Sequence, residues 1–122
     1  MSVFIHFGVE QCDQTVVVSL SDDAMIDRGV IVELCDELTT LVDQQMPQKL
    51  LLSFSGVARI SSEVISVLIR VRKQLLVHGR ELALCDINDE TREALRILRL
   101  DGTLFRIFSS RSEALVAMNG VS

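Results

Sequence analysis

The feature that most constrains the fold is a short, nearly continuous apolar segment, Lys49-Leu-Leu-Leu-Ser-Phe54. Its length suits a β-strand. A strand that is apolar on both faces belongs in the middle of a largely parallel sheet, where helices cover both sides. Ser55 and Gly56 end this segment. The rest of the chain alternates between helical and strand periods, which is typical of an α/β domain.

The N-terminal third predicts a hairpin followed by a helix. Residues Thr15–Leu20 are rich in β-branched side chains, and we expect them to pair with Val3–Phe7 through a polar turn at residues 11–14. From Asp23 the apolar spacing changes to every three or four residues, which predicts a helix that ends before Pro47. The apolar stripe of this helix comprises Ile26, Val30, Leu34, Leu38 and Leu41 or Val42.

A second helix and a further strand follow the central strand. The helix ends at His78-Gly79, where glycine supplies a left-handed cap. Glu81–Cys85 is then a short apolar strand. The stripe of the second helix comprises Val64, Val67 or Leu68, Val71 and Leu75.

The last third predicts two more helices around one strand. Asn88 or Asp89 caps a third helix, in which Leu95 and Leu98 face inward. Phe105–Phe108 is the last strand. The full order, ββαβαβαβα, predicts an α/β domain. A terminal helix is expected through Ala114, Leu115 and Met118, with Ser110 or Ser112 as its cap.

Composition bounds the class of protein. The 122 residues are 48% hydrophobic and 24% charged, and they contain one proline and no low-complexity tract, so we expect a single domain spanning residues 1–122. No apolar run approaches the roughly 18 residues that cross a bilayer. The N-terminus lacks the features of a signal peptide. We therefore expect a soluble, cytoplasmic protein without membrane insertion.

Charge and cysteine content exclude further classes. A formal net charge of −5 and the absence of Trp and Tyr argue against a nucleic-acid partner. The three cysteines, Cys12, Cys35 and Cys85, are widely spaced and form no Cys-x-x-Cys motif. They are expected to be buried free thiols, neither a disulfide framework nor a metal site.

The sequence predicts no enzyme. Neither standard glycine-rich phosphate-binding motif is present. His6 and His78 do not have a metal-ligand spacing and are expected to be structural or surface residues. The acidic loop of Asp86, Asp89 and Glu90 is interpreted as helix capping and first-turn acids. We assign no catalytic residue, metal ligand or cofactor, and a nucleophile at Cys85 paired with a histidine stays open as a minor alternative.

The turn before the second helix carries the most informative polar residues. Val57 and Ile60 attach the connection to the core, and Ser61 and Ser62 then stand where the helix begins, with both hydroxyls expected to face solvent. Either serine could cap the helix, and a phosphate would be electrostatically favoured there. Phosphorylation would add about −1.5 to −2 charges. The residue types alone leave capping and regulated docking both open.

This region resembles the STAS domain of anti-sigma factor antagonists. The motif comprises Ser55-Gly-Val57, Ile60, the serine-bearing turn and a helix reading Val67-Leu-Ile-x-x-x-Lys-x-Leu75. The resemblance covers almost the whole chain and is specific from about residue 50 to residue 115. It implies a STAS-like mixed sheet of four to five strands, with parallel central strands and about four helices. Later matching segments are Leu82–Asn88, Leu95–Leu98, Leu100-Asp101, Leu104–Phe108 and Ser112–Leu115.

The resemblance also implies a functional site. Aligned on Ile60, Ser62 falls on the serine that the family phosphorylates, and Ser61 is the second candidate. Ser61 replaces the family's usual aspartate, Glu63 replaces its second serine, and Val64 and Ser66 replace glycines. The partner-binding residues implied by this alignment are Arg59, Ser61, Ser62, Glu63 and Ser66.

The function implied is that of a regulatory binding module. Such a module docks a kinase-like anti-sigma factor, a serine kinase of the histidine-kinase-like ATPase type, through the turn at Ser61-Ser62 and the following helix. Phosphate on Ser62 then blocks the contact. Because the turn departs from the family's pattern, a second hypothesis is a STAS adaptor that is not phosphorylated and serves a larger regulatory or transport assembly.

Overall fold

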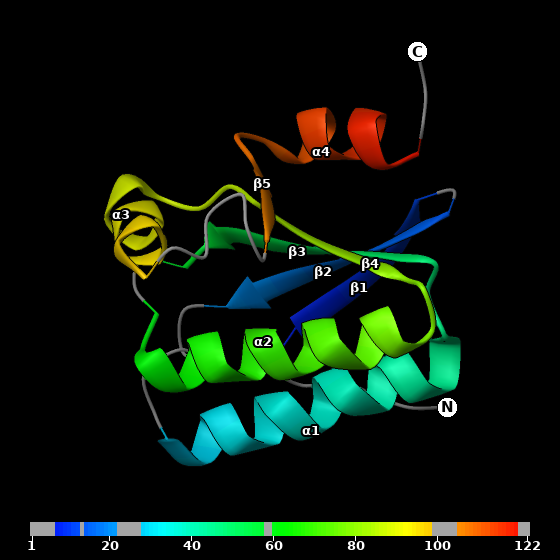
Figure 1. The fold of residues 1–122 in the computed structure, drawn as a ribbon, viewed down its shortest axis with the longest axis horizontal. Coiled ribbons are helices and arrows are strands. Elements are labelled where there is room, and N and C mark those ends of the chain that lie inside the picture. The colour runs from blue at the N-terminus through cyan, green and yellow to red at the C-terminus, as the bar shows by residue number, and fades with distance from the viewer. Residues whose placement is uncertain (1–6, 13, 22–27, 58–59, 99–104, 120–122) are drawn as a thin grey trace.

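The structure, a computed structural model, describes residues 7–12, 14–21, 28–57, 60–98 and 105–119. In this part of the chain, one five-stranded sheet is combined with four helices (Figure 1). The α/β class and the predicted element order are confirmed. The strands are β1 (Phe7–Cys12), β2 (Thr15–Ser21), β3 (Lys49–Gly56), β4 (Glu81–Cys85) and β5 (Arg106–Phe108). The helices are α1 (Arg28–Gln45), α2 (Ser62–Val77), α3 (Asp89–Ile97) and α4 (Arg111–Met118).

The sheet is mixed, with β3 at its centre. The strands lie in the order β1-β2-β3-β4-β5; β1 and β2 are antiparallel, and every other neighbouring pair is parallel. Leu50, Leu51 and Leu52 of β3 are each 0% exposed. The expectation of a central strand buried on both faces is confirmed.

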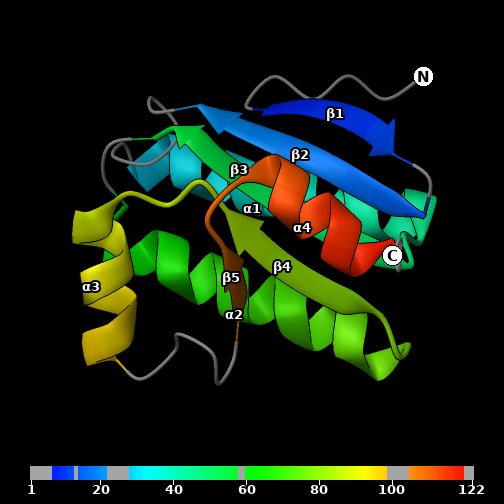
Figure 2. The same ribbon diagram turned by 90° about the horizontal axis from the view of Figure 1, so that it is seen from above.

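The two faces of the sheet are covered unequally. Alternate residues of β3 point to opposite faces, so Leu50 and Leu52 join one core cluster while Leu51 joins the other. Helices α1 and α2 cover the face with the larger cluster, and α4 covers the opposite face (Figures 1 and 2). The core therefore lies mainly between the sheet and the pair α1–α2.

The N-terminal hairpin is confirmed, but its first strand was placed too early in the sequence. Strand β1 spans Phe7–Cys12, and Cys12 pairs with Thr15, so the turn is much tighter than the predicted 11–14. Gln11 was assigned to the turn because it is polar, yet it lies on an exposed edge strand, where polar residues are tolerated. Residues 3–6 of the predicted strand lie outside the described residues, as does Ile26 of the first helical stripe.

Two details of the C-terminal third differ from expectation. Leu98, predicted to face inward, is 54% exposed, because α3 ends at Ile97 and lies at one end of the sheet, where its last turn extends past the core (Figure 1). Of the alternative caps, the structure selects Asn88 for α3 and Ser110 for α4. Over the described residues, no helix is both long and apolar enough to cross a bilayer.

Candidate functional site

The candidate site is the turn that joins β3 to α2. Val57 is 7% exposed, and its backbone N–H donates to the carbonyl of Phe54 at 2.9 Å, which fixes the exit from the strand. Ser61 has extended backbone angles and is the N-cap of α2; its side-chain oxygen accepts a hydrogen bond from the N–H of Val64 at 3.4 Å. The cap satisfies one of the N–H groups that the start of a helix leaves unpaired.

Ser62 is the first residue of α2, and its side chain is exposed. Its backbone carbonyl accepts a hydrogen bond from the hydroxyl of Ser66 at 3.2 Å. The expectation that both serine hydroxyls face solvent is correct for Ser62 and wrong for Ser61, which is half-buried because it serves as the cap. The structure thus separates the roles of two neighbours that the sequence left interchangeable.

Four of the five predicted binding residues lie together at this helix end. Ser61, Ser62 and Glu63 are consecutive, and Ser66 follows one turn later on the exposed surface. Glu63 is exposed in the first turn, where a carboxylate interacts favourably with the helix dipole. The fifth residue, Arg59, lies outside the described residues.

A groove of about 320 Å³ begins beside this helix end, and we call it the α1–α2 groove. Sequence reasoning missed its α1 wall, because none of the α1 residues that line the groove belongs to the predicted apolar stripe. The available signals were Ile31 and Val32, apolar residues that lie off the predicted stripe, and Val32 is 58% exposed. The groove is lined by Ile31, Val32, Cys35 and Asp36 of α1 and by Glu63, Ser66, Val67 and Arg70 of α2.

The other flank of the turn packs near α3. A smaller hollow of about 110 Å³ is lined by Ile60, Glu90, Thr91 and Ala94. Asn88 caps α3 by accepting from the N–H of Thr91 at 2.8 Å, and Asp89 and Glu90 form the acidic first turn. The predicted placement of Asp89 and Glu90 as first-turn acids is therefore confirmed, while the cap itself is Asn88. Within the described residues, no group of three or more His, Cys, Asp or Glu side chains could hold a metal ion.

The cysteine proposed as a nucleophile has no exposed surface. Cys85 is 0% exposed, and burial, with a smaller contribution from a hydrogen bond to Asp86, raises its pKa to about 12. A thiol with this pKa is protonated at neutral pH and is a poor nucleophile. His78 is the exposed C-cap of α2, whereas His6 lies outside the described residues. This geometry does not support a nucleophile at Cys85.

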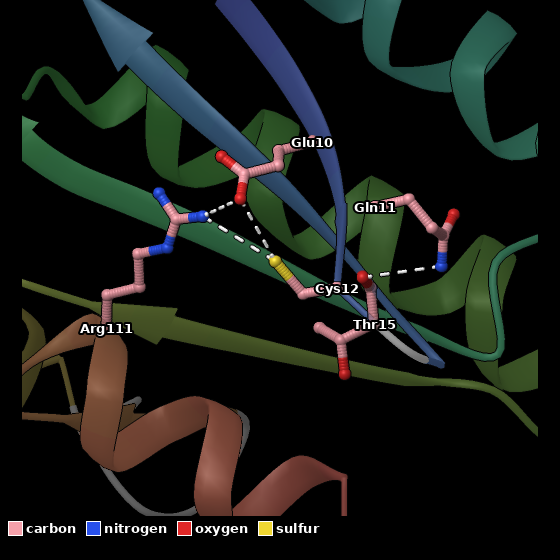
Figure 3. Close-up of polar contacts among 5 residues, drawn as sticks. All are labelled: Glu10, Gln11, Cys12, Thr15 and Arg111. Atoms are coloured by element: carbon pink, nitrogen blue, oxygen red, sulfur yellow. Dashed lines mark hydrogen bonds and ion pairs between the residues drawn. The ribbon is translucent and has the colours of Figure 1, made fainter.

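The expectation of three buried thiols is correct for Cys35 and Cys85 and wrong for Cys12, which is half-buried on the edge strand β1. The thiol of Cys12 donates to Glu10 Oε2 at 3.3 Å, and Arg111 Nη2 lies 2.7 Å from the same oxygen and 3.6 Å from Cys12 Sγ (Figure 3). The hydrogen bond from Arg111 lowers the pKa of the Glu10 carboxyl, and the same hydrogen bond raises the pKa of the Arg111 guanidinium. These contacts fasten α4 to the edge of the sheet.

The family of the chain follows from a comparison with family profiles. The profile described as the STAS domain matches residues 7–114, so the chain belongs to the STAS domain family. No curated protein matches the sequence significantly. The family match includes the turn, the groove and every described strand.

Solved structures share the fold at low sequence identity. An anti-sigma-factor antagonist (STAS) domain protein from Planctomyces limnophilus has a TM-score of 0.82 and 23% identity, with 93% of this chain and 97% of that chain covered. The anti-sigma factor antagonist SpoIIAA of Bacillus, in its unphosphorylated form, has a TM-score of 0.78, 16% identity and coverage of 95% and 98%. SpoIIAA in its phosphorylated form has a TM-score of 0.69. A chain from the stressosome, described as a signal integration and transduction hub, has a TM-score of 0.75, 17% identity and coverage of 93% and 97%.

Proposed function

We propose that this chain is a regulatory binding module that docks a kinase-like anti-sigma factor through the turn at Ser61-Ser62 and helix α2, and that phosphorylation of Ser62 releases the partner. The observation that carries the proposal is the division of labour between the two serines. Ser61 caps the helix, so the exposed hydroxyl of Ser62 is not needed to hold the fold together.

The helix end can accept a phosphate without unfolding. Backbone N–H groups and the positive end of the helix dipole stabilise an anion at the first turn. Modification would replace a small neutral hydroxyl by a group with about −1.5 to −2 charges. Glu63 already places a carboxylate next to Ser62, so the modified turn would present a concentrated negative charge to a docked protein. Charge and bulk together oppose a contact built for the unmodified serine.

One protein that shares the fold supports a switch by phosphorylation. SpoIIAA, which shares the fold, has been solved in both an unphosphorylated and a phosphorylated form. The proposal extends that behaviour to Ser62 of this chain. The proposal also includes a cytoplasmic location and no catalytic activity for this chain.

The test starts from capture of the partner from the cytosol of the source organism, with mass spectrometry of the partner and of Ser62. The purified partner is then titrated with the wild type, Ser62→Ala and Ser62→Asp. We expect Ser62→Asp to weaken binding by about 5- to 150-fold, the usual range for a regulatory coupling. Incubation with a kinase partner and ATP should add one phosphate to the wild type and none to Ser62→Ala.

Ser112→Asp is the matched control, since Ser112 is also an exposed serine in the first turn of a helix. It should bind like the wild type. Equal affinity of Ser62→Ala and Ser62→Asp for the partner would refute the switch.

A second candidate is a STAS adaptor that is never phosphorylated. The observation that favours it is Glu63, a permanent negative charge beside Ser62 at the position of the family's second serine. The likeness to a chain of the stressosome supports a place in a larger assembly. The adaptor hypothesis predicts that the same complex is recovered with and without ATP. It also predicts that Ser62→Asp leaves this complex intact.

A further inference from the structure

We infer that the α1–α2 groove binds a basic side chain, an arginine or lysine carried on an apolar segment of the partner protein. The inference rests on the proposed function for the existence of a protein partner beside Ser62. It goes further by adding α1 to the docking surface and by naming the chemistry that the groove selects.

The groove lies at the N-terminal half of both helices. Helices α1 and α2 run side by side on one face of the sheet (Figure 1). Arg70 Nη1 donates to Cys35 Sγ at 3.7 Å, and Gln74 Nε2 donates to the carbonyl of Thr39 at 3.4 Å, so the two helices run in the same direction. The groove therefore opens next to the first turn of α2, where Ser62 is exposed.

The wall of the groove is apolar. Ile31, Cys35 and Val67 are between 4% and 8% exposed and form its base, and Val32 projects at 58% exposure. A surface of this shape suits the methylene stem of a long cationic side chain, which packs against apolar atoms while its charged end stays in water.

The rim of the groove is acidic. Asp36 of α1 and Glu63 of α2 carry carboxylates there, against one cation, Arg70. Arg70 is held toward α1 by its contact with Cys35. Helix α1 contains four acidic residues and one basic residue, Arg28 at its first position, and the whole chain has a formal net charge of −5. Charge complementarity therefore selects a basic partner segment.

A negative charge at residue 62 is expected to weaken binding of the whole partner but not binding of a cation in the groove. The two proposals can therefore be tested separately. A negative charge at residue 62 attracts a cation in the groove. Ser62→Asp should therefore leave the binding of a basic probe unchanged or slightly stronger. The same substitution should weaken binding of the whole partner if the switch is correct. If the groove proposal is wrong, binding of the basic probe fails. If the switch is wrong, Ser62→Asp does not weaken binding of the whole partner.

The test uses three acetylated, amidated peptides, Ala-Leu-Arg-Leu-Ala and its counterparts with glutamate or norleucine in place of arginine. Titration into ¹⁵N-labelled protein should shift amide resonances of residues 31–36 and 63–70 with the arginine peptide. Asp36→Asn and Val32→Ala should each weaken this binding by about two- to fivefold, the range expected for one exposed ion pair or a few methyl contacts. Raising the salt concentration should weaken it too.

Glu113→Gln provides the control, since it makes the same charge change on an exposed residue of α4, on the other face of the sheet. It should bind the arginine peptide like the wild type. Equal binding of the arginine and glutamate peptides, shifts confined to other surfaces, or no response to Asp36→Asn in a variant that unfolds at the wild-type temperature would overturn the proposal. Self-association that Val32→Ala abolishes, without peptide binding, would assign the groove to a second copy of the chain and overturn it as well.

Discussion

The side-chain oxygen of Ser61 accepts a hydrogen bond from the backbone N–H of Val64 at 3.4 Å, and this bond makes Ser61 the cap of helix α2. The next residue, Ser62, is exposed as the first residue of the helix. Adjacent serines in one turn thus have different surroundings. Ser61 contributes to the stability of the fold, whereas the side chain of Ser62 is exposed to solvent.

The first prediction separates these two roles by stability. Ser61→Ala should lower the free energy of unfolding by about 0.5–1 kcal/mol, because the N–H of Val64 loses its partner. Ser62→Ala should change it by less than about 0.5 kcal/mol, as expected for an exposed position. Urea denaturation of both variants measures the difference. A larger loss for Ser62→Ala than for Ser61→Ala would show that the caps are assigned the wrong way round.

The second prediction concerns the contact of Glu10 with Arg111. Because the folded-state pKa of Glu10 lies below its ordinary value of 4.5, the pair stabilises the fold above that pH, and the contribution is lost as the pH falls through the lower folded-state value. Glu10→Gln should therefore be less stable than the wild type at pH 7. The gap in unfolding midpoint should close as the pH is lowered well below 4.5. A gap that does not change with pH, or that is unaffected by 1 M salt, would contradict an ionic origin.

The fold could be predicted almost completely because the decisive signals are local. A fully apolar β3, apolar stripes at helical spacing and Gly79 after α2 each follow from residues that are close in sequence. The errors fall where local polarity and tertiary position disagree. Gln11 and Cys12 are in an edge strand that tolerates polar residues, and Leu98 continues a helical period past the end of the core.

The candidate site was predictable only in part, because some of its residues follow from local sequence and others depend on tertiary packing. Ser61 and Ser62 were marked by the helix start, whereas the preference for Ser62 and the inclusion of Glu63 came only from the resemblance to the STAS domain. The α1 wall of the groove was not found, because the approach of Cys35 to Arg70 joins residues 35 positions apart. No local pattern encodes which exposed faces of two helices meet.

The third prediction distinguishes the three thiols by access. Brief treatment of the native protein with iodoacetamide at pH 8 should modify Cys12, which is half-buried, and spare Cys35 and Cys85. The pKa of about 12 keeps Cys85 protonated as well as buried. Peptide mapping by mass spectrometry locates the label, and all three should react in 6 M guanidinium. Native labelling of Cys85 at the rate of Cys12 would contradict the packing of β4.

The fourth prediction tests the corrected position of Leu98. Leu68→Ala should lower the free energy of unfolding by about 2–5 kcal/mol, because Leu68 is 1% exposed in the larger core cluster. Leu98→Ala should cost less than about 0.5 kcal/mol, because that side chain is 54% exposed. Chemical denaturation gives both values. A loss at Leu98 comparable to that at Leu68 would show that the end of α3 is packed against the core after all.

The last prediction concerns the turn after α2. The N–H of Arg80 donates to the carbonyl of Leu75 and the N–H of Gly79 to that of Leu76, each at 2.9 Å, a pattern that requires a left-handed residue, and Gly79 has φ of +68°. An added Cβ at Gly79 would meet nothing within 4 Å, so Gly79→Ala should cost only the backbone strain, about 1–2 kcal/mol.

Gly8 on β1 supplies the matched control, since a Cβ there also meets nothing within 4 Å. Its backbone is not among the positive-φ glycines of the described chain. Gly8→Ala should therefore leave stability unchanged or raise it, because glycine is the costlier residue within a strand. The midpoint temperature of thermal unfolding should fall in Gly79→Ala and should stay unchanged or rise in Gly8→Ala. Equal destabilisation by both would mean that the methyl group itself, and not the left-handed conformation at Gly79, causes the loss.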